Sequence, residues 1–130
     1  MADINAFNLL HPLVQQELYR MKWTQLRFIQ VEAIKSIHNN ENHLVISAST
    51  ASGKTEAAFL PILSEVMTKE LTPVSVLYIS PIKALLNNQE ERLRELSSFI
   101  YGDVFKWHGD VEKTNKNKFI KNKAHVLMIT

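Results

Sequence analysis

The sequence contains no cysteine, which excludes disulfide bonds and thiolate metal sites. Its histidines are scattered and lack the paired spacing of a metal site. No apolar run approaches the ~18–20 residues that span a bilayer. The N-terminus also lacks the basic start and apolar stretch of a signal peptide. We therefore expect a cytoplasmic protein that makes no contact with a membrane.

The chain has little excess of either charge, because its 130 residues give a net charge of only +2. Overall charge is therefore a weak argument for nucleic acid. The lysines are nevertheless concentrated between residues 103 and 123, a segment that contains six lysines and three acidic residues. Such a cluster can neutralise phosphates, but it is also typical of a solvated helix face. The sequence alone leaves both interpretations open.

Glycine is scarce as well, with three in the chain, and one of them lies in a phosphate-binding motif. Residues 48–55 read Ala-Ser-Thr-Ala-Ser-Gly-Lys-Thr, between an apolar run at 44–46 and a helical pattern. A strand–loop–helix of this kind holds phosphate oxygens on backbone N–H groups at the positive end of the helix dipole. Alanine replaces the glycines that are common at positions 48 and 51. The residues expected to bind the nucleotide phosphates are Ser49, Thr50, Ala51, Ser52, Gly53, Lys54 and Thr55.

The last two residues of this motif have the most specific predicted roles. Lys54 is expected to reach the outer phosphates, and the hydroxyl of Thr55 is expected to bind Mg²⁺. Both are therefore our candidate catalytic residues. The simpler alternative is a glycine turn that opens a helix and leaves a lysine exposed.

Hydrophobic periodicity predicts an α/β domain in which strands alternate with helices. Residues 1–42 are expected to form amino-terminal helices, and residues 43–130 an incomplete nucleotide-binding core within one structural unit. Such an alternation favours a mostly parallel sheet, which binds ligands beyond the carboxyl ends of its strands. The predicted helices span 12–21, 25–38, 54–67, 84–100 and 111–122, and the predicted strands span 43–47, 74–79, 104–107 and 125–129. The strand at 74–79 is almost continuously apolar, as expected for burial on both faces.

Four segments resemble, in order, the first motor domain of superfamily-2 DEAD/DEAH-box helicases of the large helicase-related type. Residues 23–30 resemble the glutamine motif, with Phe7 as its preceding aromatic, and 48–59 resemble motif I. Residues 78–85, Tyr-Ile-Ser-Pro-Ile-Lys-Ala-Leu, resemble motif Ia, and 107–110, Trp-His-Gly-Asp, resemble a further family segment. The likeness runs from about Phe7 to Thr130.

The resemblance implies a RecA-like P-loop NTPase fold with ATP and Mg²⁺ as cofactors. It implies that Gln30 reads the adenine edge, because an amide can donate and accept together. Trp23 or Phe28 would pack near the base, although a core position suits either equally well. The residues implied to lie along one strand of DNA or RNA are Pro81, Lys83, Ala84 and Gly109, with Asp110 shaping the turn.

Hydrolysis of a nucleoside triphosphate also needs an acidic residue to hold the metal ion. The strand at 125–129 is of the right type, but no acidic residue follows it in the sequence. The resemblance places an Asp-Glu box beyond Thr130 and implies a second RecA-like domain. We therefore interpret the chain as the amino-terminal part of a helicase motor, which we expect to be inactive alone. The alternatives are another P-loop class, such as a small-molecule kinase or transporter ATPase, and a truncated, non-catalytic nucleic-acid-binding module.

Overall fold

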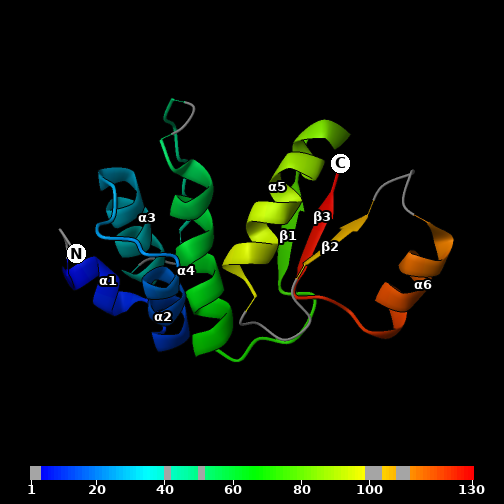
Figure 1. The fold of residues 1–130 in the computed structure, drawn as a ribbon, viewed down its shortest axis with the longest axis horizontal. Helices are drawn as coiled ribbons and strands as arrows, with labels where there is room; N and C mark the ends of the chain where they lie inside the picture. The colour runs from blue at the N-terminus through cyan, green and yellow to red at the C-terminus, as the bar shows by residue number, and fades with distance from the viewer. Residues whose placement is uncertain (1–3, 40–41, 50–51, 99–103, 108–111) are drawn as a thin grey trace. The chain divides into compact units, whose positions relative to one another are not determined.

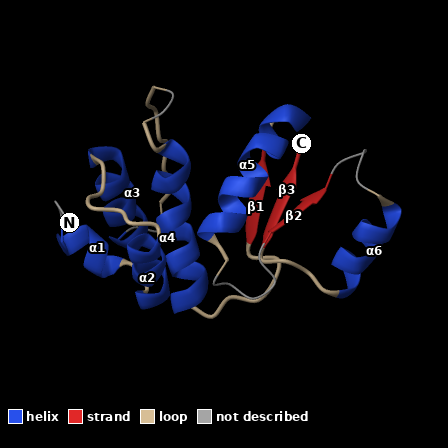
Figure 2. Ribbon diagram, viewed as in Figure 1, coloured by secondary structure: helices blue, strands red, loops and turns tan. Residues whose placement is uncertain are grey.

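A computed structural model describes residues 4–39, 42–49, 52–98, 104–107 and 112–130. The chain clusters into two compact units, Met1–Glu70 and Leu71–Thr130 (Figure 1). In the described residues of the first unit the regular elements are helices, whereas the second unit holds a parallel sheet (Figure 2). No helix in the described ranges is long and apolar enough to cross a membrane. The domain boundary predicted after residue 42 stays a prediction.

The first unit is a cluster of four helices: α1 (Ile4–Leu9), α2 (Pro12–Arg20), α3 (Phe28–Asn39) and α4 (Lys54–Thr68). Helix α3 packs on α4, while α1 contacts α3 and α2 contacts α4. The sequence predicted three of these helices but not α1, because six residues are too few to show a helical period. The buried core side chains include Phe7, Leu18, Ile34, Leu60 and Leu63.

Helix α2 begins at a side-chain cap that also ties it to α4. His11 accepts a hydrogen bond on Nδ1 from the backbone N–H of Leu13, at 3.1 Å, and Pro12 occupies the first helical position. The backbone N–H of His11 donates to the hydroxyl of Ser64, at 2.7 Å. Because Ser64 is a buried residue of α4, this bond fixes the start of α2 on its neighbour.

Helix α4 runs from the end of the phosphate-binding motif through an internal proline. Pro61 removes the hydrogen bond to the carbonyl of Ala57, yet the helix continues to Thr68. Pro61 is itself buried, along with Phe59, Leu63 and Val66. The predicted helix is confirmed, and its packing outweighs the missing hydrogen bond.

The strand predicted at 43–47 is wrong. The structure assigns no strand to these residues. They lie directly before the phosphate loop, which is where an apolar strand was expected. Val45 is 90% exposed and Leu44 is 41% exposed. A strand is defined by a hydrogen-bonded neighbour, and in the described part of the chain all paired strands belong to the second unit. The apolar composition of this segment therefore does not show that it pairs with another strand.

The second unit confirms the predicted parallel sheet. Strands β1 (Val76–Ile79), β2 (Val104–Trp107) and β3 (Val126–Ile129) pair in the order β1-β3-β2, with β3 central. Tyr78 and Lys106 both stand opposite Met128 in the parallel register. Helices α5 (Lys83–Leu96) and α6 (Lys113–Lys121) make the connections between successive strands.

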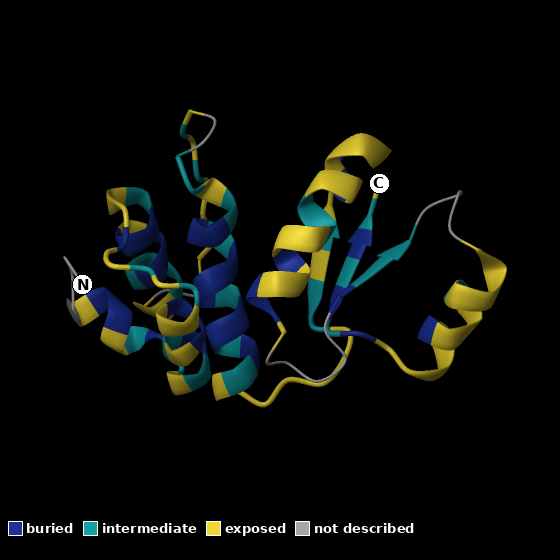
Figure 3. Ribbon diagram, in the orientation of Figure 1, coloured by how far each residue is buried: buried dark blue, intermediate teal, exposed yellow. Residues whose placement is uncertain are grey.

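The sheet is covered more fully on one face than on the other. Helix α5 contacts β2 and β3 and buries Leu86, Leu93 and Leu96. Because side chains alternate along a strand, Leu77 and Ile79 share the opposite face. They are 55% and 67% exposed. Figure 3 shows exposed stretches along β1. The predicted burial of this strand on both faces is therefore wrong, because β1 is an edge strand of the described sheet and one of its faces is exposed.

Candidate phosphate-binding site

The loop at 48–53 connects the extended segment 43–47 to helix α4. The hydroxyl of Ser52 donates to the carbonyl of Ser49 at 2.5 Å, which closes the turn. Thr50 and Ala51, two of the predicted phosphate ligands, lie outside the described residues. Within the described part of the loop, Ser49 and Ser52 are therefore joined by a hydrogen bond.

Gly53 is the residue at which the loop becomes a helix. It has φ 84° and ψ 27°, in the left-handed region, and its carbonyl accepts from Ala57 N at 2.9 Å. A Cβ at this position would lie 2.5 Å from Nε2 of Gln30, which is closer than real Cβ atoms approach. The dihedral angle favours glycine here, and a Cβ would in addition displace the amide of Gln30.

The predicted catalytic residues, Lys54 and Thr55, form the first turn of α4. Gly53 has no side chain with which to cap this helix, so it accepts none of the first N–H groups of the helix. These groups and the positive end of the dipole suit a bound anion. Lys54 is exposed, and Thr55 is partly buried beside Glu56. The helix start therefore offers backbone donors, a cation and a hydroxyl within one turn.

Gln30 of α3 is buried against the loop, with an exposed fraction of 2%. Its Oε1 accepts from the backbone N–H of Arg27 at 2.9 Å, and its Nε2 donates to the carbonyl of Gly53 at 3.4 Å. One amide thus joins the start of α3 to the phosphate loop. The structure brings these two predicted site residues together although 23 positions separate them.

Arg27 is a neighbour of the site that sequence reasoning missed. Its carbonyl accepts from the N–H groups of Gln30 and Val31, both at 3.0 Å, and so starts α3. Its Cδ lies 3.5 Å from where a Cβ on Gly53 would be. The signal was present, because a glutamine three residues after a helix start is half of a capping box.

The two aromatic candidates for the nucleotide base differ in exposure. Phe28 is 80% exposed at the first position of α3, two residues before Gln30. Trp23 is half-buried, and its backbone N–H donates to the carbonyl of Leu18 at 3.0 Å. A core role is therefore excluded for Phe28, whose ring is exposed to solvent.

The remaining predicted site residues gather at the start of α5 in the second unit. Ser80 is buried, and its backbone N–H donates to Ile129 O at 3.0 Å at the carboxyl end of the sheet. Ile82 caps α5 without a polar side chain, while Pro81, Lys83 and Ala84 are exposed. Gly109 and Asp110 lie outside the described residues. The site residues thus form two groups, one in each unit.

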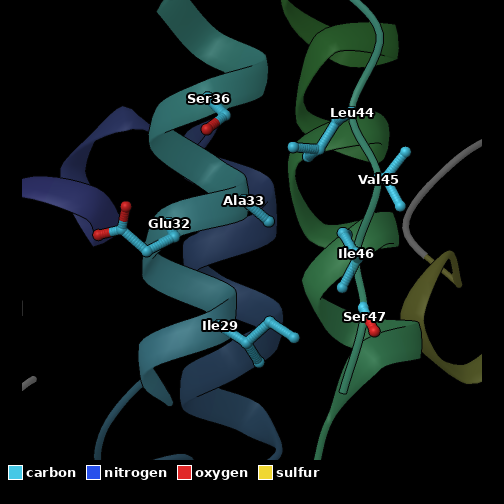
Figure 4. Close-up of a pocket in the computed structure, with 8 residues that line it drawn as sticks. All are labelled: Ile29, Glu32, Ala33, Ser36, Leu44, Val45, Ile46 and Ser47. Carbon is cyan, nitrogen blue, oxygen red and sulfur yellow. The ribbon is translucent and has the colours of Figure 1, made fainter.

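A cavity of about 170 Å³ lies between α3 and the segment 44–47 (Figure 4). Its walls are largely apolar, formed by Ile29 and Ala33 on one side and by Leu44, Val45 and Ile46 on the other. The charged side chain at its edge is Glu32. Its carboxylate points away from the segment 44–47 in Figure 4, and the apolar walls make this cavity unsuited to a nucleotide phosphate.

The DEAD/DEAH box helicase family matches residues 27–130. The ATP-dependent helicase Lhr-Core of Methanocaldococcus jannaschii is 31% identical over 147 residues, covering 99% of this chain and 17% of that protein. Lhr-Core of Saccharolobus solfataricus is 35% identical over 142 residues, covering 99% of this chain and 16% of the relative. The chain thus spans about a sixth of the length of these relatives.

Solved helicase structures have the same fold. The DUF1998 helicase MrfA bound to DNA and AMPPNP superimposes with a TM-score of 0.81 at 25% identity, over 94% of this chain and 17% of that one. The DEAD-box helicase Mss116 bound to ssRNA and UDP-BeF gives the same TM-score at 23% identity, over 94% of this chain and 26% of its own. The predicted RecA-like P-loop fold is confirmed.

Proposed function

Because this chain belongs to the DEAD/DEAH box helicase family, we propose that it binds ATP at residues 48–55 and forms part of an ATP-dependent helicase motor. The observation that carries the proposal is the left-handed Gly53 at the start of α4, held against Gln30. A loop that needs glycine there leaves the first N–H groups of the helix to an anion. The family gives no support to a kinase or a transporter ATPase.

Lys54 and Thr55 would complete the phosphate site. The ammonium of Lys54 would bind the outer phosphates, and it is exposed and one residue from Gly53. Mg²⁺ prefers oxygen ligands and keeps several waters, so one hydroxyl and the phosphate oxygens suit it. Thr55 offers that hydroxyl in the first turn of α4. Bound Mg²⁺ would neutralise charge that develops on the phosphates.

Gln30 and Phe28 would recognise the base of the nucleotide. Gln30 lies against the phosphate loop, and Phe28 presents its ring to solvent two positions away. An exposed aromatic ring suits stacking on a base, and an amide suits the adenine edge. We therefore assign adenine preference to Gln30, to be measured as the affinity ratio of ATP to GTP before and after Gln30→Ala. An unchanged ratio would place base recognition elsewhere.

Nucleic acid would bind at the start of α5, through the backbone around Pro81, Lys83 and Ala84. Support comes from their exposure and from the apolar cap at Ile82. Helix starts and lysines are common contacts to phosphate oxygens. Gly109 would join them, and a second RecA-like domain would complete the motor. A chain without cysteine suits the reducing cytoplasm, where we propose that the motor works.

The proposal is tested by Lys54→Ala, with the affinity for a fluorescent ATP analogue as the readout. A hydrogen bond to a charged group contributes about 1.5–3 kcal/mol, so affinity should fall about 10- to 100-fold. The midpoint of urea unfolding should not change, since Lys54 is exposed. Lys69→Ala removes the same charge from the other end of α4 and should leave affinity intact. Equal affinities for Lys54→Ala and the unmodified protein would overturn the assignment.

A further inference from the structure

Helix α6 is basic, and the acidic residue of its segment is Glu112 at the N-cap. From Lys113 to Thr130 the sequence has five lysines and neither aspartate nor glutamate. At 100° per residue, Lys113, Lys118 and Lys121 lie on the outer side of the helix, away from the buried Phe119. All three are exposed. The outer side of α6 is therefore a positively charged face, here called the lysine face.

This charge works against the helix that carries it. Lys113 stands in the first turn, where the positive end of the dipole disfavours a cation. Lys113 and Lys116, and likewise Lys118 and Lys121, are like-charged neighbours at a spacing of three, which is destabilising. Only the lysines of the last turn are placed where they suit the dipole. If this face were only exposed to solvent, a mixture of acidic and basic side chains would make the helix more stable than lysines alone.

Aromatic packing fixes this helix on the sheet. Phe119 stacks on Phe105 of β2 with ring centroids 4.7 Å apart, and Trp107 meets Phe119 edge-on at 5.9 Å. Lys116 Nζ lies 5.3 Å from the centre of the Trp107 ring. Nine residues are too few for a stable isolated helix. The aromatic cluster therefore holds the lysine face in one orientation on β2.

We propose that the lysine face is a second contact for the sugar–phosphate backbone of nucleic acid, apart from the start of α5. The inference rests on the proposed function, because it requires a chain that binds nucleic acid. A polyanion would relieve the repulsion along α6. Lys113 and Lys121 are eight residues apart, or about 12 Å along the helix, which equals the axial rise of three to four nucleotides in a duplex strand at about 3.4 Å each. A lipid surface is the alternative polyanion, but a helix that binds there needs a broad apolar face. On α6 the exposed large apolar residue is Ile120, and one such side chain does not make that face.

The test is the salt dependence of binding to a fluorescein-labelled oligo-dT strand, measured by anisotropy on the complete protein that carries these residues. The variant Lys113→Gln/Lys118→Gln/Lys121→Gln should reduce the slope of log K against log salt by about 2, since each lost single-strand contact contributes about 0.7. Affinity should fall at least tenfold in low salt. The control Lys22→Gln/Lys35→Gln/Lys69→Gln removes the same charge from the first unit and should keep the slope.

The outcomes separate this inference from the proposed function. If the unmodified protein does not bind the strand, the proposed nucleic-acid binding is wrong and the inference falls with it. If it binds and the lysine-face variant keeps the full slope, the second contact alone is wrong. Equal loss in both triple variants would show an effect of net charge and would also overturn it. Lysine-dependent binding to phosphatidylserine vesicles, with the oligonucleotide slope unchanged, would assign the face to a membrane.

Discussion

Substitution of Gly53 by alanine tests the geometry of the phosphate loop most directly. A non-glycine residue in the left-handed region costs about 1–2 kcal/mol, of which the stiffer unfolded chain offsets about 0.4–1 kcal/mol. The new Cβ would also lie 2.5 Å from Gln30 Nε2. The amide of Gln30 must therefore move away from its present position.

Displacement of Gln30 sets the rest of the magnitude. The amide would lose its hydrogen bonds to Arg27 N and Gly53 O, at about 0.5–1.5 kcal/mol each. The total is about 2–4 kcal/mol against the present loop conformation. If that conformation binds ATP, affinity should fall about 30-fold to several hundred-fold. A fluorescent ATP analogue gives the affinity, and urea unfolding gives the stability.

A double-mutant cycle with Gln30→Ala separates the two causes. In the Gly53→Ala/Gln30→Ala protein the collision is gone and the dihedral strain remains, so the two substitutions should couple by about 1–2 kcal/mol. Ala58→Gly is the matched control, because it exchanges the same residues within α4 at an ordinary helical position. Its cost should be about 1 kcal/mol of stability, without a selective loss of ATP. Additive effects in the cycle, or unchanged affinity in Gly53→Ala, would refute the reasoning.

Two further predictions concern stability. Lys22 has φ 61° and follows the end of α2. The N–H of Lys22 donates to Tyr19 O and that of Trp23 to Leu18 O, a helix ending at which glycine is preferred. Lys22→Gly should therefore stabilise the fold by about 1 kcal/mol, whereas Lys22→Ala should not, and equal urea midpoints for the two would contradict this. Burial lowers the pKa of His125 below the usual 6.5, while its Nδ1 lies 2.9 Å from the hydroxyl of Ser75. Between 6.5 and the lower folded pKa the unfolded chain binds more protons, so stability should fall as pH drops below 6.5. His125→Gln should flatten that slope, and identical pH slopes would refute the prediction.

The helices and the strands of the second unit were predictable because their signals are local. Leu86, Leu93 and Leu96 recur at helical spacing, and all three are buried on one side of α5. The error at 43–47 has a different origin. Strand formation depends on a hydrogen-bonded neighbour far away in sequence, and the apolar run 44–46 carries no information about that neighbour. The exposure of Leu77 and Ile79 escaped prediction for the same reason, because the position of β1 at the sheet edge is a property of the whole sheet.

The candidate site divides along the same line. A phosphate loop consists of one turn and the start of one helix. Its signature therefore lies within eight consecutive residues, 48–55, and can be recognised in the sequence. The contact between Gln30 and Gly53 joins two helices and could not be read from either segment. Arg27 escaped prediction because its hydrogen bonds at the start of α3 come from its backbone, so that its spacing to Gln30 is the signal for it.

If Gln30 recognises the base as proposed, its position would connect base recognition to the phosphate loop. A glutamine amide has two N–H donors and an oxygen with two lone pairs. One lone pair faces Arg27 N and one donor faces Gly53 O. A donor and a lone pair are left in the inventory of the amide, and this is the pair that an adenine edge requires. The hydrogen bonds to Arg27 and Gly53 would therefore use a different donor and lone pair from the proposed hydrogen bonds to adenine. A base bound by Gln30 would hold the amide in place against Gly53, and the collision that a Cβ causes there would disturb both ends of the nucleotide at once.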